Sequence, residues 1–192
     1  MKANGHNFLF GNPTDFAIEA GLEPGLVPPS EVWGHVRILC DSVSIGNIEN
    51  LHCALSDAAM GFAEKLEQLD ALWDEELNGL DHRGIWNFLD GKLYGYHGDL
   101  EIEDQRTLEQ VQADAARYGK FNFLTNWGEP FDGCKAFIMI PPVHRQVRIL
   151  YDVTKPSFEL RSAEVSREEF VEAARTFIAW FDEQRGRLSA GR

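Results

Sequence analysis

Histidines and carboxylates occur together at both ends of a glycine-rich, aromatic stretch in the middle of the chain. Asp81 and His82 precede this stretch, and His97 and Asp99 follow its aromatic part. If the two ends approached one another, two imidazoles and two carboxylates would suit a metal ion or acid–base catalysis. A small metal-dependent or acid–base hydrolase that uses His82, His97 and Asp99 is therefore one hypothesis. The sequence supplies no reason for the two ends to converge.

Other catalytic and cofactor-binding motifs are absent from the sequence. It contains no HExxH zinc motif, no pair of cysteines at zinc-binding spacing, no GxxxxGK[ST] or GxGxxG phosphate loop and no GxSxG nucleophile motif. His52 and Cys53 are neighbours, but adjacent side chains on a helix diverge by about 100°, which separates a nucleophile from its base. We therefore predict a protein that is not an enzyme, with no catalytic residues, no metal and no cofactor.

The charge of the chain is strongly negative. Its 192 residues include 31 Asp and Glu against 18 Lys and Arg, for a formal charge of −13. Phosphate contacts need a basic face, so nucleic acid is disfavoured as a partner. A negative field steers the approach of a basic protein, and a basic protein partner is favoured. Simple solubility is the alternative explanation of the charge.

Two stretches are candidate surfaces for such a partner. In the first, residues 48–80 have apolar side chains every three or four positions, which predicts one long amphipathic helix with an acidic outer face. In the second, aromatic residues adjoin a short acidic run, which is typical of an interface that is anchored by rings and steered by charge. Solvated surface and aromatic packing are the respective alternatives. The candidates are Glu64, Glu67, Asp70, Asp74 and Glu75 in the first stretch, and Trp86, Tyr94, Tyr96, Asp99, Glu101, Glu103 and Asp104 in the second.

An antiparallel sheet is predicted at each end of the chain. Two apolar runs around an Asn-Pro-Thr-Asp turn at residues 12–15 indicate a hairpin, which strands at residues 32–40 and 43–45 would extend into a four-stranded meander. Residues 136–140 are apolar on both faces, which is typical of a central strand covered by helices. The strands expected near the carboxyl end are residues 121–124, 136–140, 147–153 and 158–161.

Helices are predicted between and after these strands. A short helix at residues 85–93 and an exposed edge or loop at residues 99–104 follow the long helix. A capping box at Thr107 and Gln110 begins another helix, with Leu108 on its apolar face, and a second box at Ser166 and Glu169 begins the closing helix. The prediction is an α+β fold: an antiparallel twisted sheet, two long amphipathic helices and one or two short ones, with the helices collected on one side.

The length and composition favour one globular domain over residues 1–184, with a frayed tail at residues 185–192. No apolar run is long enough to span a membrane, and the first residues lack a signal-peptide core. Three widely spaced cysteines, Cys40, Cys53 and Cys134, suit reduced thiols rather than a disulfide framework. We expect a cytoplasmic protein with no membrane partner; the oligomeric state stays open.

Three groups of residues carry a resemblance to a known family. They are Phe10-Gly11-Asn12-Pro13 with Phe16-Ala17-Ile18-Glu19, then Gly34-His35-Val36-Arg37-Ile38 before Ile45-Gly46, and finally Glu129-Pro130-Phe131-Asp132. With these motifs the chain resembles immunity protein family forty-two of bacterial polymorphic toxin systems. The resemblance implies a protein that binds and neutralises the C-terminal domain of a cognate toxin, as in contact-dependent growth inhibition. Such toxins are often nucleases with basic clefts. An adaptor or regulatory module with an unrelated partner is a further alternative.

Overall fold

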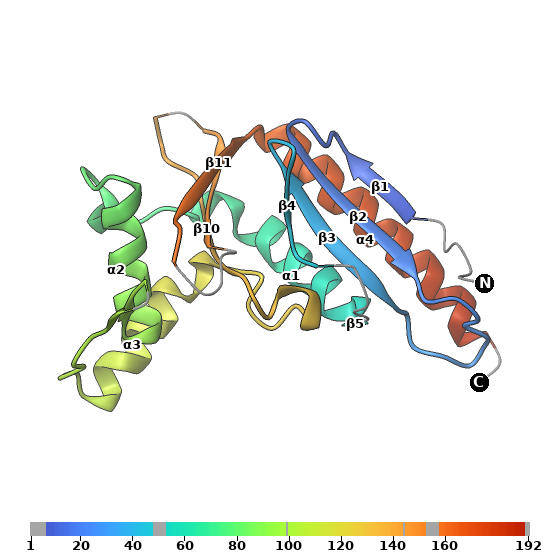
Figure 1. The fold of residues 1–192 in the computed structure, drawn as a ribbon, viewed down its shortest axis with the longest axis horizontal. Helices are drawn as coiled ribbons and strands as arrows, with labels where there is room; N and C mark the ends of the chain where they lie inside the picture. Colours follow the sequence, from blue (N-terminus) through green and yellow to red (C-terminus); the bar gives the residue numbers. More distant parts are fainter. Residues whose placement is uncertain (1–6, 48–52, 99, 144, 153–157, 191–192) are drawn as a thin grey trace.

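The computed structural model describes residues 7–47, 53–98, 100–143, 145–152 and 158–190. It confirms an α+β fold with antiparallel sheets and amphipathic helices, but the strands form separate sheets rather than a continuous one (Figure 1). A five-stranded sheet comes from the first part of the chain and a four-stranded sheet from the last part. A two-stranded hairpin lies between them in sequence.

The first sheet is the predicted meander with one additional strand. Strands β1 (Asn7–Gly11), β2 (Phe16–Leu22), β3 (Trp33–Cys40) and β4 (Val43–Ile45) are neighbours in that order, and β5 (Cys53–Ala54) also pairs with β3. The β1–β2 turn closes where the Asn12 amide donates to the Phe16 carbonyl. The side chains that alternate inward from these strands are buried in the main core.

The second sheet has the order β11-β10-β9-β8. Strands β8 (Asn122–Phe123), β9 (Lys135–Met139) and β10 (Val147–Asp152) lie within the predicted ranges or within one residue of them. The predicted strand at residues 158–161 is wrong, because β11 spans Arg161–Val165. Phe158 instead packs against Trp86, with ring centroids 5.4 Å apart.

The long helix predicted over residues 48–80 is also wrong. Helix α1 spans only Leu55–Gln68, and two short 3₁₀ helices follow, η1 (Leu69–Ala71) and η2 (Glu75–Leu77). The chain leaves the helical direction at Leu72, whose carbonyl accepts a hydrogen bond from the Ile140 amide at the end of the second sheet. Residues 48–52 lie outside the described part of the chain.

Two of the remaining helices begin where the sequence predicts: α3 (Leu108–Tyr118) has the predicted capping box at Thr107, and α4 (Arg167–Ser189) is capped by Ser166. Helix α2 (His82–Tyr94) is capped by Asp81 and begins before the helix predicted at residues 85–93. The expectation of a frayed tail fails at residues 185–189, because α4 continues through them. Leu188 is buried there, and its carbonyl accepts a hydrogen bond from the Ser30 amide.

Two apolar clusters hold these elements together. The larger one joins the first sheet, α1 and α4 to one face of the second sheet, and the smaller one packs α2 on the opposite face through Trp86, Phe137, Met139 and Leu150. Helices therefore lie on both sides of the second sheet rather than on one. Strand β9, predicted as a central strand with helices on at least one side, is covered on both faces. Together α2 and α3 form the end of the molecule opposite β1 (Figure 1).

Candidate functional site

The histidine pairs of the sequence do not form a site. His82 begins α2, whereas His97 lies beside Gly91, about 14 Å further along the helix. Asp81 accepts a hydrogen bond from the Gly84 amide at 2.7 Å as the cap of α2, and Asp99 lies outside the described residues. Within the described ranges, no group of three His, Cys, Asp or Glu side chains is arranged to hold a metal ion.

The buried cysteines are poorly suited to nucleophilic chemistry. Burial raises the pKa of the Cys53 thiol to about 12, and it raises the pKa of Cys40 as well. The thiolate is the reactive form of cysteine, so both thiols are held in their unreactive form at neutral pH. The sequence-based view of these cysteines as reduced thiols agrees with the free cysteines of the structure.

The first acidic stretch is not one helix face. Glu64 and Glu67 lie on α1, Asp70 on η1, and Asp74 and Glu75 at the start of η2. Lys65, which the sequence places among these acids, is buried, and its ammonium donates to the Lys120 carbonyl at 2.9 Å.

Arginines from distant parts of the chain pair with several of these acids. Arg167 lies 2.7 Å from Asp70, and Arg117 binds both Asp74, at 2.7 Å, and Glu76, at 2.8 Å. The hydrogen bond from Arg117 is the largest cause of the lowered pKa of Asp74. This stretch therefore exposes much less unpaired negative charge than its sequence predicts.

The aromatic residues of the second stretch differ in accessibility. Trp86 is 1% exposed, so its side chain belongs to the core rather than to the surface. Tyr94 is half-buried, and its hydroxyl donates to Asn122 Oδ1 at 2.6 Å. Tyr96 is exposed, but its ring lies 5.5 Å from the Lys135 ammonium, which also covers Tyr94.

A buried ion pair fixes this stretch to the second sheet. The Asp90 side chain is fully buried on α2, and Lys135 of β9 donates to it at 2.8 Å. The other carboxylate oxygen of Asp90 accepts a hydrogen bond from the Gly98 amide at 2.9 Å. The hairpin of β6 (Tyr96–His97) and β7 (Leu100–Glu101) is thereby held against α2. Asp90 is not among the residues predicted from the sequence, although a carboxylate directly after Leu89 of the predicted helix is a signal that could have identified it.

Arg106 holds the segment after the hairpin. Its guanidinium donates to the Gly91 and Lys92 carbonyls at the end of α2 and to the carboxylates of Asp104 and Asp114. These bonds use every nitrogen of the side chain. The hydrogen bonds from Arg106 hold the pKa of Asp104 at about 2. We name the hairpin and the segment it leads into, residues 96–98 and 100–106, the acidic arm.

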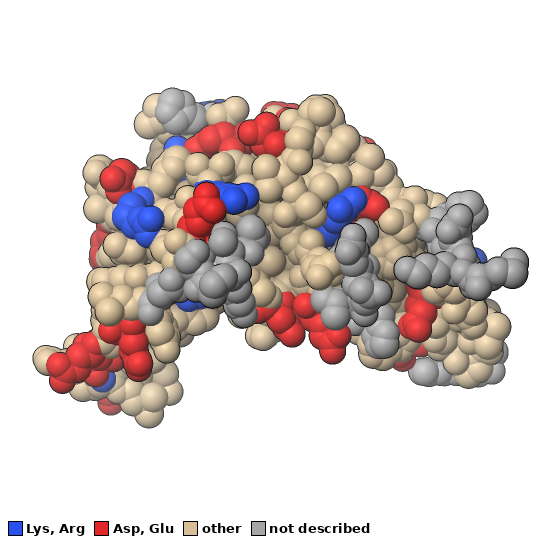
Figure 2. Space-filling view, in the orientation of Figure 1, with Lys and Arg blue, Asp and Glu red and all other residues tan. Residues whose placement is uncertain are grey.

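The acidic arm presents unpaired carboxylates to solvent. Glu101 and Glu103 are exposed, and neither makes a hydrogen bond or ion pair with the part of the chain that the structure describes. Leu100 beside them is 67% exposed. Figure 2 shows acidic side chains gathered at the lower left, over the segment that joins β7 to α3 in Figure 1. Leu108 is also exposed at the start of α3, against the prediction that it would face inward.

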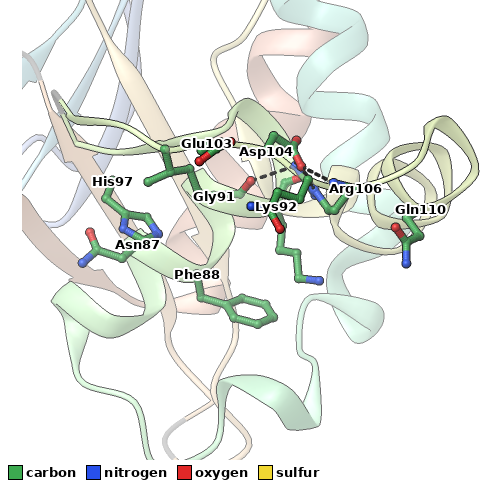
Figure 3. Close-up of a pocket in the computed structure, with 11 residues that line it drawn as sticks. Asn87, Phe88, Gly91, Lys92, His97, Glu103, Asp104, Arg106 and Gln110 are labelled. Atoms are coloured by element: carbon green, nitrogen blue, oxygen red, sulfur yellow. Dashed lines mark hydrogen bonds and ion pairs between the residues drawn. The ribbon is translucent and has the colours of Figure 1, made fainter.

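A cavity of about 530 Å³ lies between the acidic arm and α2 (Figure 3). Phe88 and Gly91 line it from the helix, and His97, Ile102 and Glu103 line it from the arm. The cavity thus combines apolar walls with the exposed carboxylate of Glu103.

Comparisons with known proteins point to one family. The family model described as immunity protein 42 matches residues 8–180. Among solved structures, the crystal structure of CdiI from Burkholderia dolosa AUO158 is similar, with 14% sequence identity, 90% of this chain and 99% of that chain covered, and a TM-score of 0.54. This likeness concerns the fold. No curated protein matches the chain.

Among the described helices, none has the length and apolar character needed to cross a membrane.

Proposed function

The chain belongs to the immunity protein 42 family, as its motifs predict, and we propose that it binds and neutralises a cognate toxin domain. The single observation that carries the proposal is the family match over residues 8–180, which includes both sheets and the first part of α4, up to residue 180. Inhibition would come from steric and electrostatic blocking rather than catalysis.

The charge of the chain supports a basic toxin domain as the partner. A surface with unpaired carboxylates attracts a basic partner and accelerates its encounter. A nuclease is a suitable candidate, because its substrate cleft is basic and a cluster of carboxylates can occupy the place of phosphates. The toxin would be one of a polymorphic or contact-dependent growth inhibition system, and the two proteins would meet in the cytoplasm.

The acidic arm is the surface that we propose for toxin binding. Leu100 and Tyr96 supply exposed apolar area, and Glu101 and Glu103 supply charge that no other described residue neutralises. Interfaces commonly combine an apolar centre with a polar rim. Glu67 and Glu75 of the first stretch remain exposed and contribute at most to long-range attraction.

Co-purification and growth rescue test the proposed function. The protein would be co-expressed with the C-terminal toxin domain encoded beside it, and growth would be followed in cells that express that domain. A stable complex with rescued growth supports the proposal. If both proteins are folded and there is neither complex nor rescue, the chain is an adaptor or regulatory module on the same fold instead.

A further inference from the structure

The cavity beside α2 has a defined chemical character. One side is formed by the ring of Phe88, which packs edge-on against Tyr118 with ring centroids 5.3 Å apart. Ile102 adds an apolar side chain from the arm, and its methyl group lies close to Gly91, where an added Cβ would be 3.4 Å from it. Asn87 and His97 supply polar groups at one end (Figure 3). The cavity therefore suits a side chain with an apolar stem and a polar head.

The cations that line this cavity are already neutralised. Arg106 is engaged by two carboxylates and two carbonyls, and the ammonium of Lys92 lies 3.2 Å from both oxygens of Asp114. Both carboxylate oxygens of Asp104 accept hydrogen bonds from Arg106. Glu103 is thus the one charged residue lining the cavity, within the described chain, whose charge has no partner.

From this charge balance, and resting on the proposed function, we propose that the cavity receives an arginine side chain of the toxin domain. The guanidinium would bind the Glu103 carboxylate, and its stem would pack on Phe88 and Ile102. Arginine suits the cavity better than lysine because its planar head forms bidentate bonds to a carboxylate and stacks on an aromatic ring. An arginine in a desolvated pocket is also a common hot spot of protein interfaces.

A matched pair of variants tests this pocket in the complex. E103Q removes the unpaired carboxylate from the cavity, whereas E109Q makes the same change at an exposed acid on α3 outside it. With the whole protein and an inactivated toxin domain, calorimetry is expected to show an affinity about tenfold lower for E103Q. The expected loss for E109Q is less than twofold. Equal losses of affinity in E103Q and E109Q would overturn the proposal that the cavity binds an arginine, because they would indicate only a general effect of charge.

A small-molecule titration tests the pocket without the toxin. N-acetyl-arginine amide is expected to shift the amide resonances of Asn87, Gly91 and His97, and the neutral analogue N-acetyl-citrulline amide is expected to leave them unchanged. Equal shifts from both compounds would overturn the proposal. The outcomes separate the two proposals: failure of the wild-type protein to bind any toxin removes the proposed function, whereas intact binding with equal losses in E103Q and E109Q removes the pocket alone.

Discussion

The two acidic stretches look alike in sequence and differ in the folded protein. In the first, Asp70 and Asp74 are paired with Arg167 and Arg117, which lie far away along the chain. In the second, Glu101 and Glu103 have no partner among the described residues. Formal charge therefore overstates the attraction that the first stretch can exert. Unpaired charge is the most available to a partner. Among the candidate acids of the first stretch, Glu67 and Glu75 keep it, whereas in the acidic arm it lies beside the exposed side chains of Leu100 and Tyr96.

The largest expected effect comes from breaking the ion pair between Lys135 and Asp90, which holds the acidic arm against α2. In K135M the fully buried carboxylate of Asp90 loses its cation, and the free energy of unfolding should fall by about 3 kcal/mol. Urea denaturation followed by circular dichroism measures this change. The control is R161M, which removes an exposed pair with Glu159 and should leave the free energy of unfolding almost unchanged. Equal stability of K135M and wild type would show that the arm is not held by this pair.

Charge reversal compares the two stretches directly. The double variant E101K/E103K should slow association with the toxin domain about tenfold at low salt, because it removes the unpaired charge of the arm. E67K/E75K changes the net charge by the same amount at exposed acids of the first stretch, which lie outside the proposed binding surface, and should slow association less than twofold. Stopped-flow mixing at two salt concentrations gives both rates. Similar slowing in the two variants would contradict the distinction between the stretches.

Removal of a pairing arginine should make the first stretch more like the second. R117Q frees the carboxylates of Asp74 and Glu76, so association with a cationic toxin should accelerate by about twofold. R161Q makes the same charge change at the edge of the second sheet, where it frees the carboxylate of Glu159, and serves as the control for position. If R117Q and R161Q associated with the toxin domain at the same rate, pairing with Arg117 would not explain the difference between the two stretches.

The smallest expected effect is a pH dependence of the arm. The pKa of Asp104 is about 2 in the folded protein and about 3.9 in an unfolded chain, so the pair with Arg106 stabilises the fold above pH 4. This contribution should disappear as the pH falls from 4 to 2. The measurement is the difference in urea midpoint between wild type and R106Q at several pH values. A difference that stays constant down to pH 2 would contradict the role given to Asp104.

Much of the fold follows from local sequence. The β1–β2 turn, the capping residues Thr107 and Ser166 and the central position of strand β9 follow from local patterns, and the structure confirms each prediction. The break after α1 was missed for a physical reason. Successive 3₁₀ turns repeat every three residues, so Leu69 and Leu77 continue an apolar spacing that also fits an α-helix.

The candidate site was less predictable because its interactions are long-range. The acids of the arm were identified by composition, but their lack of partners depends on where each arginine lies after folding. Arg117 is 43 residues from Asp74, and Lys135 is 45 residues from Asp90. No local spacing encodes such pairs. Trp86 was assigned to the surface for a similar reason: its burial depends on Phe137, which comes from another part of the chain.

The two-sided burial of β9 has a consequence for how the protein can diversify. One face of this strand completes the main core, and the other face is covered by α2. Substitutions on the solvent side of the acidic arm alter neither core, so that surface is free to follow changes in a partner while the scaffold is retained. Loss of the whole arm and α2 is a different event, because it would uncover Phe137, Met139 and Leu150. Variation in recognition is therefore expected by substitution or replacement of this region, and not by its deletion.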